Sequence, residues 1–373
     1  MPDILPALIP IGENETRIWG MDNHERLRRI AKARGMPFDR AAASAPALLV
    51  DQGFVFDPSW IPYFAGRPGE VLTLGGKAVI AHVRDDGEAA AVRASAAAKA
   101  PLAADSGLDT IAYEDGATIA NEALRKREQP FVMPLDPTTV RAAERASYFG
   151  AYKGVTDLLT KYLWPEWALV LTRFAARIGM SPNMVTSIGA LFCVLATIAF
   201  WYGHYFTGMA LGLVFMVLDT VDGKLARCTI TSSKWGDVFD HGLDLVHPPF
   251  WWVAWAVGLH AYGRPLEYST LAWVLGAILG GYVVQRLIEG AFLQLYHMHI
   301  HVWRPFDSQF RLITARRNPN MVILFVATLI GQPDVGLIAV AWWTVISLVV
   351  HAAQLVQAMT FTARGGKVRS WLE

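Results

Sequence analysis

Cysteine is almost absent from this chain, which has only two among its 373 residues. Cys193 lies inside an apolar run and Cys228 lies in a polar stretch, so we expect two reduced thiols and no disulfide framework. The N-terminus, MPDILPALIPIGENETR, has no basic start followed by an apolar core. We therefore expect no secretory signal peptide.

An excess of charge of one sign is also missing. The chain has 33 Lys and Arg against 32 Asp and Glu, for a formal net charge of +1. Binding to nucleic acid needs a basic stripe that neutralises several phosphates, and the sequence contains none. We therefore expect no nucleic-acid partner.

Apolar residues are abundant but unevenly distributed. They make up 53% of the chain, yet up to about residue 145 the sequence has the mixed composition of a soluble protein. After about residue 163 it becomes a series of long apolar runs separated by short polar loops. This pattern predicts a soluble N-terminal domain followed by a helical membrane domain.

Six segments have about the length needed to cross a bilayer, roughly 20 residues. The second and third contain aspartates, and the fifth is short. The segments are residues 183–202, 205–227, 236–259, 268–289, 318–332 and 335–361.

The basic residues of the loops predict the orientation of these spans. Basic residues concentrate in cytoplasmic loops. With the N-terminal domain inside, the outer loops contain only Arg264. We therefore expect a multi-pass protein of the cell inner (plasma) membrane with both termini and the active site cytoplasmic. The basic residues of the inner loops and of the tail 363–373 are Lys224, Arg227, Lys234, Arg304, Arg311, Arg316, Arg317, Arg364, Lys367 and Arg369.

The segment before the first span, residues 141–180, contains KYLWPEWALVLTRFAARIGM. Its leucines and aromatics alternate with arginines, as in an amphipathic helix. We expect this helix to lie in the cytoplasmic membrane interface. The alternative is a soluble helix docked on a core.

Four aspartates stand where the second and third spans meet the inner loop. Residues three or four apart share a helix face, so Asp219 and Asp222 face one way, as do Asp240 and Asp244. The connecting loop is short, so we expect antiparallel neighbouring helices with converging carboxylates. Such carboxylates repel one another unless cations are present, and Mg²⁺ pairs carboxylates with phosphates. The pattern predicts two divalent ions, Mg²⁺ or Mn²⁺, of the kind used in phosphoryl displacement.

Small residues and one arginine accompany the aspartates. Gly223 and Ala226 lie on the same helix face as Asp219 and Asp222. Gly236 lies on the same face as Asp240 and Asp244. A nucleotide that approaches a helix backbone needs such an absence of side chains, and Arg227 can meet a pyrophosphate. The alternative is a structural ion-pair network or a cation or proton pathway. A conduction pathway does not require small residues at fixed offsets.

These residues resemble the signature of a known family, the CDP-alcohol phosphotransferases (CDP-alcohol phosphatidyltransferases). The matching pattern is Asp219-x-x-Asp222-Gly223-x-x-Ala226-Arg227, eight residues, then Gly236-x-x-x-Asp240-x-x-x-Asp244. SPNMVT, residues 181–186, is similar to the segment that opens the first span in that family. The resemblance covers about residues 145–362, including the six spans.

The resemblance implies a function and a role for each matching residue. Asp219, Asp222 and Asp240 would hold two divalent ions, and Asp244 would share an ion and act as general base. The acceptor hydroxyl would attack the β-phosphorus of a CDP-linked donor and expel CMP. The donor would be CDP-diacylglycerol or a similar CDP-alcohol, in phospholipid biosynthesis, and the protein would be a homodimer. The residues implied to contact the nucleotide are Asp219, Asp222, Gly223, Ala226, Arg227 and Gly236.

The acceptor-binding residues are less well defined by the sequence. Arg286, Arg316 and Arg317 lie near the inner ends of the fourth and fifth spans and are candidates for binding an anionic headgroup or a phosphorylated acceptor. Arg286 could also pair with Glu289, and each of the three arginines could instead be a positive-inside anchor. The acceptor alcohol itself stays open.

Residues 1–140 are predicted to form an α/β domain. We expect helices over 24–36 and 88–100, strands over 46–50, 70–74 and 77–83, and a mobile segment over 101–116. The arrangement is similar to the nucleotidyltransferase-like domain fused to some members of the family. No glycine-rich phosphate loop with a basic residue is present, so we expect an inactive domain with a scaffold or dimer role. The alternative is a bifunctional protein whose active cytidylyltransferase domain makes a CDP-inositol-type donor, which the membrane domain then uses to form a polar-headgroup phosphodiester.

Overall fold

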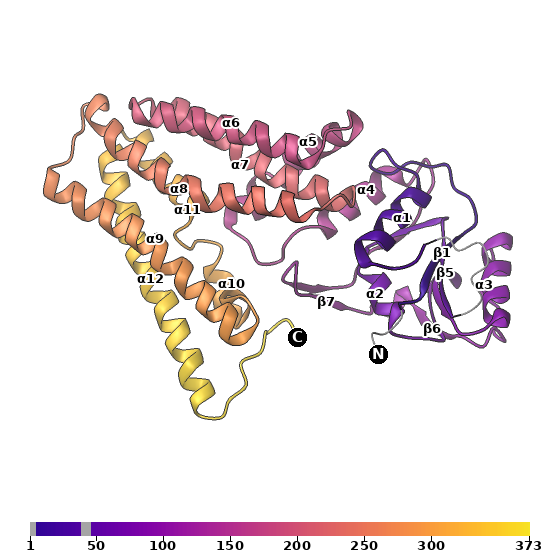
Figure 1. Ribbon diagram of the computed structural model, residues 1–373. Helices are drawn as coiled ribbons and strands as arrows, with labels where there is room; N and C mark the ends of the chain where they lie inside the picture. Colours follow the sequence, from indigo (N-terminus) through magenta and orange to yellow (C-terminus); the bar gives the residue numbers. More distant parts are fainter. Residues whose placement is uncertain (1–4, 39–45) are drawn as a thin grey trace.

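The computed structural model describes residues 5–38 and 46–373. An α/β domain lies at one end of a set of long helices (Figure 1). The predicted combination of a small α/β domain with a mostly helical remainder is confirmed.

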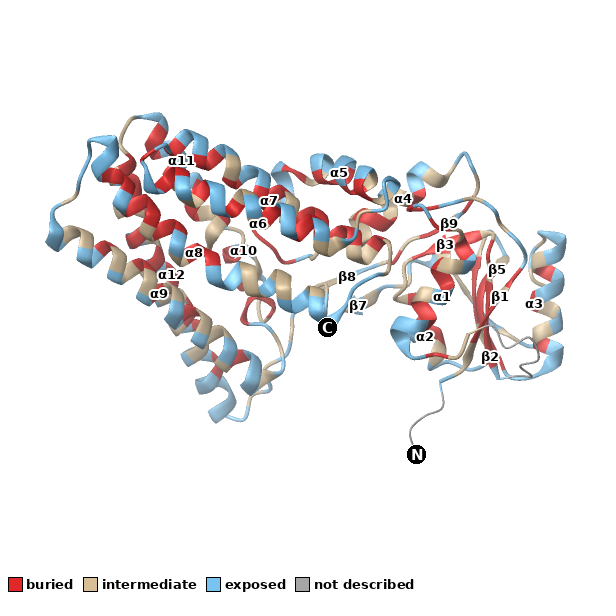
Figure 2. Cartoon of the chain, turned by 45° about the horizontal axis from the view of Figure 1, so that its top comes forward, coloured by how far each residue is buried: buried red, intermediate tan, exposed pale blue. Residues whose placement is uncertain are grey.

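The N-terminal domain is built on a mixed five-stranded sheet of order β1-β2-β5-β4-β6. The pairs β1–β2 and β4–β6 are parallel, and the other two pairs are antiparallel. Apolar side chains cover both faces, and Figure 2 shows the central strands in red. Helices α1 and α2 pack on one face and α3 on the other, giving three layers. The elements are β1 Ala7–Ile11, α1 Asn23–Arg34, β2 Ala47–Asp51, α2 Trp60–Ala65, β4 Glu70–Leu74, β5 Lys77–Val83, α3 Asp86–Ala98 and β6 Asp109–Ala112.

Four short strands connect this domain to the helices. β3, Phe54–Phe56, pairs with β9, Val132–Pro134, and β7, Ile119–Asn121, forms a hairpin with β8, Lys126–Glu128. Our expectation of a mobile segment over 101–116 is wrong in part, because β6 pairs with β4 within it. The strand was missed because it is short and lies at the sheet edge.

Two helices precede the long ones. α4 spans Val140–Gly150, and α5 spans Pro165–Arg177 after a π-helical turn over Leu159–Leu163. α5 buries Leu169 and leaves Trp167, Val170 and Phe174 more than half exposed. The predicted amphipathic helix is therefore present, and its location in the membrane interface stays a prediction.

Three of the long helices, α6, α9 and α12, are long and apolar enough to cross a membrane. The sequence predicted six spans, and these three helices agree with three of them. α7 and α8 are long but contain the aspartates, and α11, with 13 residues, is only about 20 Å long. The helices are α6 Pro182–Trp201, α7 Tyr205–Cys228, α8 Lys234–Tyr262, α9 Tyr268–Tyr296, α10 Pro305–Phe310, α11 Arg317–Leu329 and α12 Pro333–Ala363.

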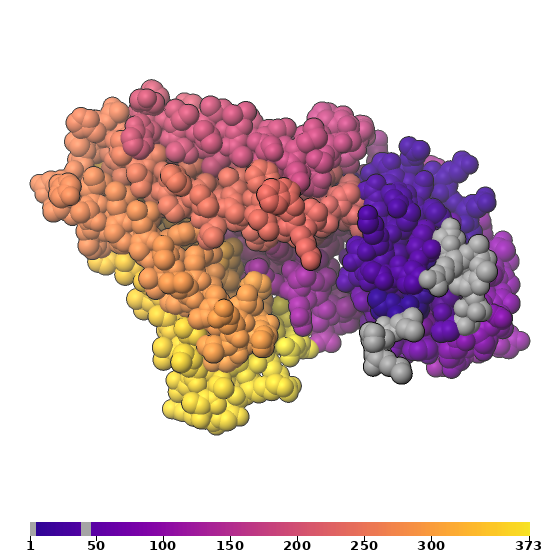
Figure 3. Space-filling view, in the orientation of Figure 1, coloured from indigo at the N-terminus to yellow at the C-terminus, as the bar shows by residue number. Residues whose placement is uncertain are grey.

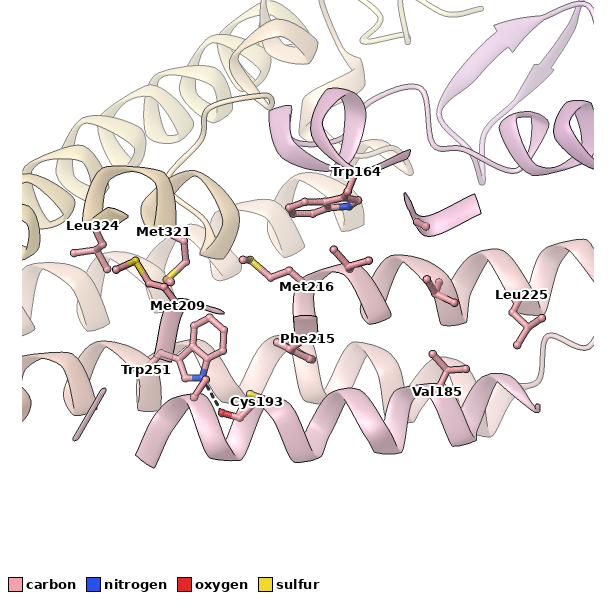
Figure 4. Packing of buried hydrophobic residues seen from close by; sticks show 14 of the residues in the cluster. Trp164, Val185, Cys193, Met209, Phe215, Met216, Leu225, Trp251, Met321 and Leu324 are labelled. Atoms are coloured by element: carbon pink, nitrogen blue, oxygen red, sulfur yellow. Dashed lines mark hydrogen bonds between the residues drawn. The ribbon is translucent and has the colours of Figure 1, made fainter. Parts of the chain in front are cut away.

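α6 packs against both α7 and α8, and α12 packs against α9 and α11. Phe215 of α7 and Trp251 of α8 fill the space between their helices, and the Trp251 indole donates to the Cys193 carbonyl of α6 at 3.3 Å (Figure 4). At Gly258 of α8 a Cβ would lie 1.9 Å from the Phe200 carbonyl oxygen. Only glycine allows this close crossing of α6 and α8.

Candidate active site

α7 and α8 bring the aspartates to the junction between the helices and the N-terminal domain. Only residues 229–233 separate the two helices. Ser233 is the N-cap of α8 and accepts a hydrogen bond from the Gly236 backbone at 3.1 Å, which sets the start of the helix. Asp240 and Asp244 then lie one turn apart on α8, and Asp219 and Asp222 lie about one turn apart on α7.

Three of the four carboxylates converge. Asp219, Asp240 and Asp244 each offer an oxygen, and these atoms all lie within 4.8 Å of one another. The Asp244 side chain is 45% exposed, against 16% for Asp219, so Asp244 is the member that a substrate can reach most easily. The predicted meeting of the two acidic helix faces is therefore present in the structure for these three residues.

Asp222 is held by a different set of contacts. It is buried, and its Oδ2 accepts a hydrogen bond from the Thr186 hydroxyl at 2.6 Å. Its Oδ1 accepts from the Gly223 backbone N–H. Thr186 belongs to SPNMVT, whose Ser181 caps the start of α6. The structure thus gives this segment a role that its sequence did not reveal: it orients Asp222.

Arg317, an acceptor-binding candidate from the sequence, bridges two of the aspartates, and its role in acceptor binding stays a prediction. Its guanidinium donates to Asp219 at 2.7 Å and to Asp244 at 2.8 Å. Arg317 is the first residue of α11, so this bridge ties α11 to both α7 and α8. The positive charge partly neutralises the carboxylates in this structure.

The other two predicted acceptor-binding arginines share a single carboxylate. Arg316 donates to both oxygens of Glu289 at 2.6 Å, and Arg286 donates to the same residue at 3.0 Å. The pairing of Arg286 with Glu289, the alternative weighed from the sequence, is confirmed. A role of either arginine in acceptor binding stays a prediction.

A cavity of about 460 Å³ opens beside the aspartates. Five residues of the signature line it, which are Asp222, Gly223, Ala226, Gly236 and Asp240. The volume lies within the range of small-molecule and cofactor sites. The two glycines and the alanine keep the wall of the cavity free of bulky side chains.

Arg227 packs over Gly223, one turn away on α7. A Cβ at Gly223 would lie 3.1 Å from a terminal nitrogen of the Arg227 guanidinium. The Nε of Arg227 is buried and has no hydrogen-bond partner in the part of the chain that the structure describes. An unsatisfied cationic donor of this kind favours an anionic ligand.

The donor set at the cluster suits hard divalent cations. It consists of carboxylate oxygens, the ligands that Mg²⁺, Mn²⁺ and Ca²⁺ prefer, and no thiolate or imidazole belongs to this group. Three carboxylates in one small volume also carry more negative charge than Arg317 balances. The residues present therefore fit the divalent metals that the sequence predicted.

Two polar residues near the site, Lys153 and Asp157, interact with charged residues of the site or its neighbourhood, and the sequence did not assign them a role. Burial lowers the pKa of Lys153 to about 8, with Arg125 and Arg227 acting in the same direction and Asp240 and Asp244 opposing them. Lys153 therefore lies within electrostatic reach of both the carboxylates and the basic side chains. Lys153 lies in a loop between helices, so no helical periodicity in the sequence could predict that it lies near the site.

Asp157 anchors the start of α11. It accepts hydrogen bonds from the Asn318 amide at 3.0 Å and from Thr160. Burial would raise the pKa of Asp157, but Arg311 and these hydrogen bonds outweigh it and hold the pKa below its usual value. Asn318 follows Arg317, so this contact helps to position the arginine that bridges the aspartates.

The fold and the site together define a mostly helical protein in which three helices are long and apolar enough to cross a membrane. Its carboxylate cluster lies beside a cavity of about 460 Å³. Residues 179–308 match the family model of the CDP-alcohol phosphatidyltransferases. This segment contains the whole acidic signature. Residues 179–308 are thus similar to CDP-alcohol phosphatidyltransferases, the family that the signature residues resemble.

Three relatives illustrate the range of this similarity. Cholinephosphotransferase 1 of Gallus gallus is 33% identical over 135 residues, which cover 32% of this chain and 38% of the relative. Phosphatidylinositol phosphate synthase of Streptomyces avermitilis is 37% identical over 93 residues, covering 24% and 38%. Choline/ethanolaminephosphotransferase 1 of Arabidopsis thaliana is 34% identical over 142 residues, covering 34% of each chain. The chain spans about a third of the length of these curated relatives.

Proposed function

We propose that the protein transfers a substituted phosphate group from a CDP-linked alcohol to a hydroxyl acceptor and releases CMP, in phospholipid biosynthesis. The observation that carries this proposal is the convergence of Asp219, Asp240 and Asp244. Asp240 also lines a cavity of about 460 Å³, together with Asp222. The named relatives act on different substrates, so the donor is either CDP-diacylglycerol or a CDP-linked small alcohol.

In this reaction each residue has a role that follows from its position. Two divalent ions bound by Asp219, Asp222, Asp240 and Asp244 would neutralise the charge that builds up on the phosphates. Asp244, the most exposed carboxylate of the converging three, accepts the proton of the acceptor hydroxyl. The acceptor oxygen forms a bond to the β-phosphorus as the bond from that phosphorus to CMP breaks. The small residues Gly223, Ala226 and Gly236, which line the cavity, would accommodate the nucleotide, and Arg227, whose guanidinium lies against Gly223, would contact its phosphates.

The contacts of the chain ends support six spans with both termini on one side. The backbone carbonyl of Glu373 accepts a hydrogen bond from Arg127 of the N-terminal β-hairpin, and the C-terminus lies close to that hairpin in Figure 1. A chain whose two ends lie on the same side crosses the membrane an even number of times. α7, α8 and α11, added to the three apolar helices, give six. Because the inner loops are basic, we expect this side to be the cytoplasmic side of the cell inner (plasma) membrane. We also expect a homodimer.

A CMP-release assay with a panel of donors and acceptors tests the proposal. The panel contains CDP-diacylglycerol and CDP-choline as donors, and inositol phosphate, glycerol phosphate, serine and diacylglycerol as acceptors. We expect Mg²⁺- or Mn²⁺-dependent CMP release with at least one pair. Asp244→Asn should lower kcat about 10²- to 10⁴-fold, because the general base is lost.

Glu267→Gln is the matched control, since this exposed carboxylate precedes α9 at the far end of the helices. Its CMP release should equal that of the wild type. Ion flux through protein-containing vesicles, without CMP release from any pair, would contradict the proposal.

A further inference from the structure

The N-terminal domain reaches the helices through an unusual tight turn. Ile18 and Met21 exchange two backbone hydrogen bonds of 2.8 and 3.1 Å, with Trp19 and Gly20 between them. Both central residues have positive φ, 55° for Trp19 and 79° for Gly20. Such turns favour Asn and Gly, and the left-handed conformation is strained for a residue like Trp. Contacts elsewhere must therefore hold Trp19 in place.

These contacts come from the helices that precede the first span. Trp19 and Met21 are buried in the same apolar cluster as Leu169 of α5. The Trp19 backbone N–H donates to Glu144 at 3.4 Å, and Glu144 pairs with Arg173 of α5 at 2.9 Å. The turn thus fixes the N-terminal domain against the helical part, and Figure 3 shows the two surfaces in direct contact.

Beside this turn, Arg29 of α1 reaches across to the loop between α7 and α8. Its Nη1 donates to the Thr229 carbonyl at 2.8 Å, and its Nε donates to Glu25 at 2.7 Å. The Arg29 side chain is 31% exposed, and within the described part of the chain no hydrogen bond of its Nη2 is present. A guanidinium has five N–H donors, so Arg29 can still donate to a ligand. Arg29 is therefore a cationic donor held in a fixed orientation.

The turn and Arg29 line the same 460 Å³ cavity as the signature residues. Trp19, Gly20, Met21 and Arg29 form one part of its wall, and Asp222, Gly223 and Asp240 form another. The indole N–H of Trp19 is buried and has no partner among residues 5–38 and 46–373. The N-terminal domain and the two acidic helices thus line the same cavity.

We propose that the N-terminal domain forms the outer wall of the nucleotide site and that Arg29 selects the base. The inference depends on the proposed function, which places the diphosphate at the aspartates. The base then lies away from the carboxylates, next to Arg29. Cytosine presents two adjacent acceptors, O2 and N3, to a guanidinium, whereas uracil carries an N–H at N3. Arg29 therefore favours a cytidine nucleotide over a uridine nucleotide, as guanidinium pairing with base acceptors does elsewhere.

The test measures equilibrium binding of CDP, UDP and inorganic pyrophosphate to the purified full chain in Mg²⁺. We expect Arg29→Ala to weaken CDP binding about 10-fold and to bring CDP and UDP to similar affinity. Pyrophosphate should bind as it does to the wild type, because the aspartates are unchanged. Arg28→Ala is the matched control: Arg28 lies on the same helix and also pairs with Glu25, but it does not line the cavity.

A second variant, Arg29→Lys, keeps the charge and removes the planar donor pair. It should retain most of the folding stability of the wild type and still lose the preference for CDP. Unchanged CDP affinity and preference in both variants would overturn the inference and leave the proposed function intact. So would an equal loss of CDP and pyrophosphate binding, which would show that Arg29 only docks the domain. A wild type that binds none of the three ligands would refute the proposed function itself.

Discussion

Gly223 and Arg227 show how single residues shape the candidate nucleotide site. A methyl group at Gly223 would contact the end of a flexible side chain, the Arg227 guanidinium, at 3.1 Å. The backbone of α7 would not be disturbed, since the Gly223 backbone is helical. The glycine therefore affects the position of the arginine more than the stability of the fold.

We predict that Gly223→Ala leaves the fold intact and weakens donor binding. Alanine in a helix is favoured over glycine by about 1 kcal/mol, so Tm should stay constant or rise. The displaced guanidinium should raise the donor KM roughly 10-fold with a smaller change in kcat. CMP-release kinetics and thermal unfolding check both parts.

Gly242→Ala provides the control on α8. A Cβ there meets nothing within 4 Å, although Gly242 lies between Asp240 and Asp244 in the sequence. The donor KM of this variant should match that of the wild type. A similar rise in KM for both variants would show that Gly223 has no specific role.

We predict that Arg317→Gln makes the stability of the protein depend on divalent ions. Arg317 is 11% exposed and bridges Asp219 and Asp244, so its loss leaves two carboxylates without a cation. Removal of one partner from a mostly buried pair costs about 3 kcal/mol. In EDTA the variant should therefore unfold at lower temperature than the wild type, and Mg²⁺ should restore most of the loss.

Arg264→Gln is the comparison for this experiment. Arg264 is half exposed, and its guanidinium lies as far as 4.0 Å from the Asp334 carboxylate, so this ion pair is weak. The Tm of this variant should change little in either buffer. An equal gain of Tm on adding Mg²⁺ to the wild type and to Arg317→Gln would contradict the prediction.

At the scale of single residues, the sequence predicts which residues form the site better than it predicts which residues they contact. Asp219 and Asp222 are three residues apart, and Asp240 and Asp244 are four apart, so each pair shares one helix face. This can be predicted because helix geometry is local. The bridge from Arg317 and the hydrogen bond from Thr186 join residues far apart in the chain. Such pairs follow from tertiary packing, which no local pattern encodes.

At the scale of single elements, α8 contains two consecutive prolines just beyond Asp244. Pro249 lacks an N–H, so the Leu245 carbonyl has no donor within the helix. The Tyr282 hydroxyl of α9 donates to that carbonyl at 2.8 Å. α8 continues through both prolines to Tyr262. A neighbouring helix thus satisfies the backbone group next to the proposed base.

We predict that Tyr282→Phe lowers activity by displacing this part of α8. The Leu245 carbonyl loses its partner, at a cost of about 1 kcal/mol, and Asp244 lies one residue away. CMP release should fall a few-fold. Tyr268→Phe, at the exposed start of the same helix, should have no effect. Equal activity of both variants and the wild type would contradict this role of Tyr282.

The elements that the sequence predicted well are those with strong patterns. The bounds of β4 and β5 agree with the predicted strands because these strands are nearly continuous apolar runs. β7, β8 and β9 have three residues each and are stabilised by pairing partners that the sequence does not identify. The six-span prediction relied on loop charge for α7, α8 and α11, since their own composition falls short of a typical span.

At the scale of the whole molecule, one apolar core joins the N-terminal domain to the helices. Trp19, Val55 and Leu135 belong to the same buried cluster as Trp164 and Phe215. The N-terminal domain also contributes Trp19 and Arg29 to the lining of the cavity.

We predict that the full chain does not make its own CDP-linked donor. Incubation with CTP, Mg²⁺ and alcohol phosphates should release no pyrophosphate, because the N-terminal domain lacks a glycine-rich phosphate loop with a basic residue. Pyrophosphate release that persists in Asp244→Asn would contradict this prediction and show an active cytidylyltransferase.

The most direct test of the central claim is a titration of the purified chain with Mn²⁺ in the presence of CDP, followed by electron paramagnetic resonance. The convergence of acidic groups from α7 and α8 predicts about two bound Mn²⁺ per chain, with at least one lost in Asp240→Asn. Absence of bound Mn²⁺ in the wild type, or binding that Asp240→Asn and Asp219→Asn leave unchanged, would contradict the account.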